Sequence, residues 1–422
     1  MRIPDKAGSP LYRVENGRRL HNVFEVLMDE KIDPVHLKKA VEDAVCLYPP
    51  VGYSVVFEDG MLFFEDNGND IVVPESGEGI IPGSAALNGH MFCVSYKDNK
   101  IRSCVSHMIT DGGGMNRFAS ALIQSYCRYH YGLELPLPHQ NPDEVLLADF
   151  WDLDYSDVEP IEEEVFDKVG FVLPETIQGK ESRRNRNMCT VRVPEECFME
   201  YVKANGTSVS VMLFLLLARA IYETCPEAEG QPVAGRITVN ARKQLGIPDT
   251  FVNCSLGAQI SVRDIDLVEE GFGTIGPRLR TSVKRQTSPE YLRYIAKGIA
   301  ETGTFPLDLR PTFTLSYMGA VDMPDLGGHV KDVLLYEGEV RKLNVYTFGG
   351  EFRFIFHFSD GSLKYAEKVA EILNREGIGA VCGEMVELPE ESDVLSDGAA
   401  AETAAGAPET AGTTALPDES EV

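Results

Sequence analysis

The stretch Cys104–Phe118, CVSHMITDGGGMNRF, has a histidine at the end of an extended apolar run, an aspartate four residues later, and then three glycines. Each glycine costs about 1 kcal/mol relative to alanine inside a helix, so we expect the glycines to interrupt regular structure. His107 and Asp111 are then residues of a tight strand-to-helix loop, not two metal ligands on one helix face. The glycines would allow unusual backbone angles and the close approach of a substrate.

Two interpretations of this loop remain open from the residues alone. In the first, His107 is a general base, because imidazole exchanges protons near neutral pH and can deprotonate a hydroxyl or an amine. The resulting nucleophile would attack an activated acyl group. In the second, His107 is structural and Asp111 is the N-cap of the following helix, whose free N–H groups point back toward the loop.

The segments on both sides of the loop predict strand–helix units. Asp33 and Pro34 suit the N-cap and first position of a helix that Pro49 ends. Two β-hairpins follow, with turns at Asp59-Gly60 and Asp98-Asn99, and the second hairpin leads into His107. After the glycines, apolar residues at helical spacing predict a helix that ends near Gly132.

The chain has 422 residues, too many for one ordinary hydrophobic core, so its order of elements predicts an α+β fold of two similar lobes. Each lobe is expected to be a mixed β-sheet with flanking helices. We place the first lobe at residues 1–165, a crossover linker at 166–187 and the second lobe at 188–387. Residues 388–422 are rich in Ala, Glu, Thr, Gly and Pro and are expected to be a disordered acidic tail.

Composition excludes several classes of function. The net charge of −27 argues against nucleic acid or an anionic membrane as the main partner. The longest apolar run, Val211–Ala218, is too short to span a bilayer, and the N-terminus lacks the apolar core of a signal peptide. Nine cysteines without a CxxC pair indicate reduced thiols in the cytoplasm and no metal site. Six histidines have no sequence neighbours that suggest a metal or catalysis: His21, His36, His90, His130, His139 and His329.

The motif HMITDG, His107–Gly112, resembles the HxxxDG motif of the chloramphenicol acetyltransferase-like superfamily, which includes condensation domains, BAHD acyltransferases and alcohol O-acetyltransferases. Three other segments resemble that superfamily in the same order, over roughly residues 10–385: HNVFEVLMDEKIDPVHLKKAVEDAVCLYP, TVNARKQLGIPDTFVNCSLGA and FTLSYMGAV. The last is most similar to the alcohol acetyltransferase-like branch. Two features depart from relatives: Ser106 replaces a first histidine, and the BAHD signature DFGWG is absent.

The resemblance implies a role for several residues. His107 would be the general base, Gly112 would leave room for substrate, and Asp111 would be structural and pair with an arginine. That arginine would be Arg242, with Arg236 as the second choice. Three more residues would line the channel between the lobes or donate a hydrogen bond to an oxyanion: Asn253, Ser316 and Tyr317.

The resemblance also implies acyl-CoA as donor substrate, with no permanently bound cofactor. Two clusters of basic residues are candidates for the coenzyme A phosphates, with solvated surface charge as the alternative: Lys180, Arg183, Arg184 and Arg186, and Arg278, Arg280, Lys284 and Arg285. The expected reaction transfers an acyl group, most simply acetyl, to the hydroxyl of a small molecule. Two alternatives are an amide-forming enzyme that uses an amine or a carrier-protein-bound donor, and a non-catalytic binding scaffold.

Overall fold

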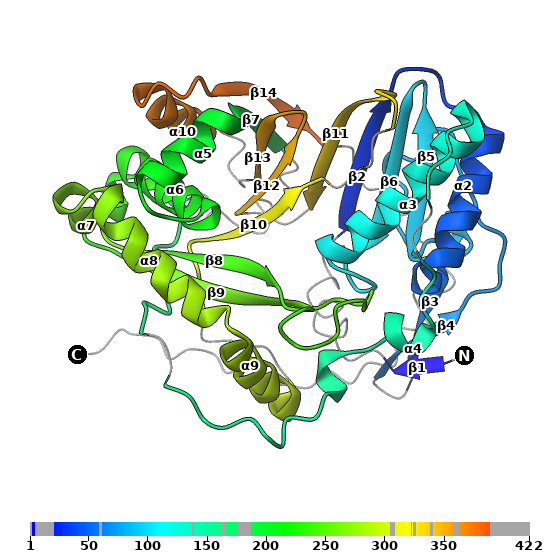
Figure 1. Cartoon of the computed structure of the whole chain (residues 1–422), viewed down its shortest axis with the longest axis horizontal. Coiled ribbons are helices and arrows are strands. Elements are labelled where there is room, and N and C mark those ends of the chain that lie inside the picture. The colour runs from blue at the N-terminus through cyan, green and yellow to red at the C-terminus, as the bar shows by residue number, and fades with distance from the viewer. Residues whose placement is uncertain are drawn as a thin grey trace, which may run out of the picture.

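The first lobe is a four-stranded sheet covered on one face by two long helices (Figure 1). The computed structural model describes residues 2–4, 21–58, 61–136, 139–162, 165–174, 187–303, 309–321, 323, 326–337, 341–357 and 363–388. The strands lie in the order β11 (Val330–Glu337), β2 (His21–Met28), β6 (Lys100–Ser106) and β5 (Phe92–Lys97). Neighbouring strands are antiparallel, and a parallel bridge joins β5 to Glu75.

The helices α2 (Pro34–Leu47) and α3 (Gly112–Tyr131) end where the sequence predicts. Asp33 caps α2 by accepting hydrogen bonds from the N–H groups of Val35 and His36. Gly132 ends α3 in the left-handed conformation that glycine favours. A small sheet of β1 (Arg2–Pro4), β4 (Met61–Asp66) and β3 (Tyr53–Glu58) and the short α4 (Asp143–Leu146) lie at one end of this lobe.

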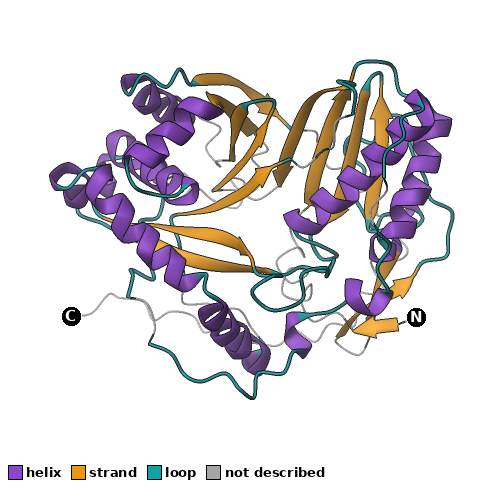
Figure 2. Ribbon diagram, viewed as in Figure 1, coloured by secondary structure: helices purple, strands orange, loops and turns teal. Residues whose placement is uncertain are grey.

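The second lobe is a seven-stranded mixed sheet. Its strand order is β14 (Val381–Glu387), β7 (Asn187–Pro194), β13 (Glu351–His357), β12 (Lys342–Phe348), β10 (Phe313–Ala320), β8 (Val233–Asn240) and β9 (Ser255–Val262). Strand β10 is parallel to both of its neighbours, and the other pairs are antiparallel. Helices cover one face of this sheet (Figure 2): α5 (Glu195–Ala204), α6 (Val209–Thr224), α7 (Asp264–Glu269), α8 (Phe272–Gln286) and α10 (Lys364–Arg375). Helix α9 (Pro289–Thr302) follows α8 and lies against the Phe150–Asp152 segment.

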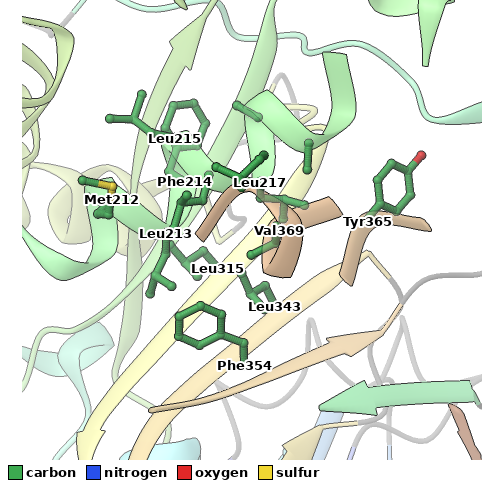
Figure 3. Close-up of a cluster of buried hydrophobic side chains, with 14 of the residues drawn as sticks. Met212, Leu213, Phe214, Leu215, Leu217, Leu315, Leu343, Phe354, Tyr365 and Val369 are labelled. Atoms are coloured by element: carbon green, nitrogen blue, oxygen red, sulfur yellow. The ribbon is translucent and has the colours of Figure 1, made fainter. Parts of the chain in front are cut away.

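The core of the second lobe is centred on α6, which is apolar on every side. Met212 to Leu217 are all buried, and they pack against Leu315, Leu343 and Phe354 of the sheet and Val369 of α10 (Figure 3). A helix that is apolar all round must be enclosed by other elements, which explains why α6 lies between the sheet and the outer helices. The opposite face of the sheet is turned toward the first lobe.

Strand β11 is contributed to the first lobe by the second half of the chain. It pairs with β2 along its length, from Val330 opposite Met28 to Glu337 opposite Asn22. The predicted division into residues 1–165 and 188–387 assigned β11 to the second lobe. The pairing of β11 with the first lobe could not be predicted, because strand pairing between distant segments leaves no local sequence pattern. The two lobes therefore share a strand as well as an interface.

No single described helix is both long and apolar enough to cross a bilayer. Helices α5 and α6 meet that test only as a pair, and they are bent by 88° relative to each other. Several predictions fall outside the described residues: the Asp59-Gly60 turn, most of the linker 166–187, the basic residues Lys180 to Arg186 and the tail beyond Leu388.

Candidate active site

The histidine of the motif lies in a turn that leaves the end of β6. Met108 and Ile109 are buried in the core of the first lobe, and the side-chain amide of Asn22 donates to the carbonyl of Thr110. These contacts fix the backbone that follows the histidine. His107 lies just before them, and its side chain remains 13% exposed. The turn therefore presents one partly accessible imidazole on an otherwise buried backbone.

A carboxylate from the exchanged strand lies next to this imidazole. Nε2 of His107 is 3.7 Å from Oε2 of Glu337, the last residue of β11. Lys342, at the start of β12, forms a buried ion pair with the same carboxylate. Nδ1 of His107 is buried and has no hydrogen-bond partner among the described residues. The imidazole thus faces a carboxylate that is held in place by a lysine of the second lobe.

Asp111 joins the two lobes through a buried ion pair with Arg242. Both side chains are about 2–3% exposed, and the two pairs of atoms, Nη1–Oδ2 and Nη2–Oδ1, are 2.9 and 2.8 Å apart. The same carboxylate accepts from the N–H groups of Gly113 and Gly114 in the first turn of α3. The N–H of Cys254 and the hydroxyl of Ser255 donate to its Oδ2. We call this set of contacts the Asp111 clasp.

Asp111 has both of the structural roles that the sequence suggested, because it is the N-cap of α3 and the ion-pair partner of Arg242. Arg236 does not take this place. Arg242 also donates to the carbonyls of Thr250 and Val252. These bonds attach the segment from Thr250 to Ser255 to the guanidinium that holds Asp111. Asn253 belongs to this segment, and its Oδ1 accepts from the N–H of Ser255. Within the described part of the chain, neither Asp111 nor Arg242 has a contact that would orient His107.

Charge keeps Asp111 ionised. Burial by itself raises the pKa of this carboxyl, but the Arg242 guanidinium and the N–H groups of Cys254 and Gly114 outweigh burial and lower the pKa to about 2. The unfolded chain binds this proton near the ordinary pKa of 3.8. The clasp therefore contributes stability that is complete above that value and is lost as the pH falls through about 2.

We predict that acid weakens the clasp in a way that depends on Asp111. The free energy of unfolding of the wild type relative to Asp111→Asn is expected to shrink by about 2 kcal/mol between about pH 5 and pH 2. Asparagine retains the N-cap and removes the titrating group, so the other carboxyls cancel in the comparison. Urea unfolding at several pH values measures the difference, and a pH-independent difference would show that Asp111 is not held ionised by the clasp.

The three glycines are the first residues of α3, which corrects the expectation that they interrupt regular structure. None of Gly112, Gly113 and Gly114 has a positive φ. Their role is close approach. A Cβ on Gly114 would lie 1.8 Å from Oγ1 of Thr110 and 2.7 Å from the carbonyl oxygen of Phe251. A Cβ on Gly113 would lie 2.9 Å from Nη1 of Arg242. Because these glycines have no side chain, Arg242 and Phe251 of the second lobe can approach the start of α3 closely.

We predict that Gly114→Ala destabilises the chain although alanine is the better helix former. Overpacking against the Phe251 carbonyl is expected to destabilise the fold by about 1–3 kcal/mol. This exceeds the stabilisation of about 1 kcal/mol that alanine gives over glycine in a helix. Gly112→Ala is the matched control, because its Cβ would meet the flexible Met318 sulfur at 3.4 Å and Oε1 of Glu337 at 4.0 Å, both ordinary van der Waals distances. Urea unfolding compares the two variants, and equal stabilities would mean that close approach does not require Gly114.

A polar face of the second sheet lies beyond the histidine. Ser316 of β10 pairs with Asn344 of β12, and both side chains are turned away from the α6 core. Asn344 is completely buried, yet neither atom of its amide group has a hydrogen-bond partner among the described residues. On the same face, Met318 lies beside Gly112, and Lys342 holds Glu337. The polar groups of Ser316 and Asn344 therefore belong to the surface that meets the histidine turn.

Two of the sequence predictions are not joined to this site. Tyr317 packs with the α6 core, 6.0 Å from the ring of Phe352, and so lies on the opposite face of the sheet from Ser316. Arg278, Arg280 and Lys284 lie on α8, whose apolar residues pack on that same core. Arg278 pairs with Glu270, and Arg280 donates to the carbonyl of Gly206. Alternation of strand residues would have separated Ser316 from Tyr317 at the sequence level.

The residues that sequence reasoning missed are Glu337, Lys342 and Asn344. They follow one another within eight residues of chain and come from two different sheets. No motif or periodicity marks them. A buried lysine, and an asparagine in a strand buried on both faces, become informative only when burial is known.

Solved structures of low sequence identity have the same two-lobed fold. TRI101 of F. graminearum, determined with coenzyme A and deoxynivalenol, superposes with a TM-score of 0.60 at 14% identity, over 90% of this chain and 99% of that chain. The trichothecene 15-O-acetyltransferase TRI3 of F. sporotrichioides gives 0.55 at 11% identity, over 88% and 93%. An epimerization domain of tyrocidine synthetase B gives 0.57 at 11% identity, over 89% and 98%. No family model and no curated protein sequence matches the chain.

Proposed function

From the chloramphenicol acetyltransferase-like fold of this chain, we propose that it is an acyltransferase that moves an acyl group from a coenzyme A thioester to a hydroxyl. The observation that carries the proposal is the position of His107. It is a partly exposed imidazole beside the Glu337 carboxylate, at the point where the turn of one lobe meets the polar sheet face of the other. Two of the similar structures are named as acetyltransferases or were determined with coenzyme A, which supports this donor.

The proposed reaction uses the imidazole as base and then as acid. His107 accepts the proton of the acceptor hydroxyl while the oxygen attacks the thioester carbonyl, and the carbonyl π electrons move to its oxygen. When the tetrahedral intermediate collapses, the C–S bond breaks and the imidazolium returns the proton to the departing thiolate. The products are the ester and free coenzyme A. The imidazole ends in its initial protonation state. All bonds and protons are therefore accounted for without a metal ion or an acyl-enzyme intermediate.

Glu337 and the polar sheet face supply the electrostatic part of this proposal. The Glu337 carboxylate, 3.7 Å from Nε2, favours the imidazolium formed during the reaction. Lys342 offsets the same carboxylate when the imidazole is neutral. The hydroxyl of Ser316 and the unpaired amide of Asn344 are the donors proposed for the oxyanion of the tetrahedral intermediate. We propose that the cell compartment of this reaction is the cytoplasm, because the chain has nine free cysteines.

The direct test supplies acetyl-CoA and longer acyl-CoAs with matched panels of small alcohols and primary amines. Release of free coenzyme A thiol is recorded at catalytic enzyme concentration, and the acylated acceptor is identified by mass spectrometry. Acceptor-dependent release with alcohols and an ester product is the expected result. If only amines are acylated, the proposed acceptor class changes from alcohols to amines. Absence of turnover with every donor and acceptor would overturn the proposal.

A further inference from the structure

Two histidines that are far apart in the sequence meet at the end of α3 that is distant from the active site. His36 lies in the first turn of α2 and His130 in the last turn of α3, and their Nδ1 atoms are 3.3 Å apart. Along helix α3, at a rise of about 1.5 Å per residue, His130 lies about 27 Å from Gly112 at the helix start. Whatever these histidines bind is therefore separate from the proposed acyl transfer.

Asp33 adds a carboxylate to the two histidines. Its Oδ1 accepts the capping hydrogen bonds from the N–H groups of Val35 and His36. Its Oδ2 does not take part in the cap and lies 3.8 Å from Nδ1 of His36. One ligand atom from each of Asp33, His36 and His130 can be chosen so that all three lie within 4.8 Å of one another. The cap thus fixes the carboxylate and leaves one oxygen available.

The spacing of these atoms suits a transition-metal ion. A tetrahedral ion with metal–nitrogen bonds of about 2.0–2.1 Å holds its ligand atoms about 3.3–3.4 Å apart. The Nδ1–Nδ1 distance of 3.3 Å has this value without any rearrangement. The same two nitrogens are within hydrogen-bond distance of each other, and imidazole nitrogens are common metal ligands. Two imidazoles and a carboxylate are a ligand set that suits zinc and its neighbours.

The surroundings of His130 orient its ring for this purpose. Its other nitrogen, Nε2, is 3.4 Å from Oε2 of Glu30, the carboxylate partner that metal-binding histidines usually have. The ring of Tyr126 stacks on His130 with centroids 5.1 Å apart and planes inclined by 14°. The hydroxyl of Tyr126 accepts from the N–H of Asp33, so one side chain positions both His130 and the capping residue. The arrangement is preformed from two helices and one loop.

We propose that Asp33, His36 and His130 form a binding site for a divalent transition-metal ion of the zinc class. Asp33 and His36 are 39% and 33% exposed, so the ion can enter from solvent and complete its coordination with water. Bound there, the ion links the start of α2 to the end of α3. The site belongs to the first lobe alone and is independent of the channel proposed between the lobes.

Titration of the intact, reduced chain with Co²⁺, followed by competition with Zn²⁺, tests the site. The wild type is expected to bind one Co²⁺ with visible d–d absorption and without a thiolate charge-transfer band. Asp33→Asn retains the helix cap and His130→Gln retains a good helix former, so both variants can fold. Each is expected to lose stoichiometric binding, and Glu30→Gln to bind about 10–100-fold more weakly.

The matched controls are Asp43→Asn and His139→Gln. Asp43 is another α2 carboxylate that contacts α3, through Ser125 and Tyr129, and His139 is an exposed histidine outside the cluster. Both controls are expected to bind Co²⁺ like the wild type, and circular dichroism checks that all variants fold. A thiolate charge-transfer band, no stoichiometric binding by the wild type, or unchanged binding by folded Asp33→Asn and His130→Gln would each overturn the proposal.

Discussion

Replacement of His107 by alanine is expected to lower the rate of acyl transfer by about 10²–10⁴-fold and to leave the fold intact. The loss follows from removal of the only proposed proton acceptor for the hydroxyl. The side chain is partly exposed, and its Nδ1 has no hydrogen-bond partner in the described structure, so its removal breaks few stabilising contacts. The measurement is initial-rate thiol release from acyl-CoA with the best alcohol from the acceptor panel.

His139→Ala is the control for this experiment, because it removes an exposed histidine away from the turn. It should keep the wild-type rate. Urea unfolding of both variants separates a chemical effect from a structural one. A His107→Ala variant that folds and retains the wild-type rate would remove the imidazole from the mechanism, and it would favour the reading of this fold as a binding scaffold.

Replacement of Arg242 by leucine is expected to have the largest effect on stability, about 3–5 kcal/mol of the free energy of unfolding. The reason is the charge that remains: Asp111 is 3% exposed and would keep a buried carboxylate without its guanidinium. The carbonyls of Thr250 and Val252 would also lose their charged donor. The double variant Asp111→Asn with Arg242→Leu is expected to recover part of the loss, because it leaves no unpaired buried charge.

Arg293→Leu is a control matched in geometry and different in burial. Arg293 pairs with Asp157 through two hydrogen bonds of 2.8 and 2.7 Å, but the arginine is 33% exposed and the aspartate 66% exposed. Surface pairs of this kind contribute about 0–1 kcal/mol. Urea unfolding of the single and double variants gives the comparison. Similar losses for Arg242→Leu and Arg293→Leu would mean that burial does not strengthen the clasp.

Local patterns predicted much of the first lobe. Asp33 with Pro34, and the later Gly132, marked the ends of two helices, because capping and left-handed φ depend on single residues. The hairpin that leads to His107 could be predicted from the alternation of apolar and polar residues and from its Asp98-Asn99 turn, where Asp98 has a positive φ. The pair of Asp111 with Arg242 came from the family resemblance, and the structure contains it.

Contacts between distant segments could not be predicted. Glu337 reaches His107 because β11 crosses to the first lobe, and Lys342 becomes a partner only when β12 is placed beside it. His36 and His130 are separated by 94 residues, and no spacing rule joins them. The glycines were assigned unusual backbone angles because propensity opposes helix at three successive glycines. In the structure Asp111 caps the helix there, and Thr110 and Phe251 leave no room for a side chain at Gly114.

The exchanged strand sets the order in which a growing chain can mature. Asp29 and His329, whose side chains bond at 2.9 Å next to the β11–β2 pairing, are 300 residues apart. While the ribosome is still making the middle of the protein, the edge of β2 has no partner, and an unpaired edge invites association with other chains. The four-stranded sheet of the first lobe can therefore be completed only after Val330–Glu337 has been synthesised.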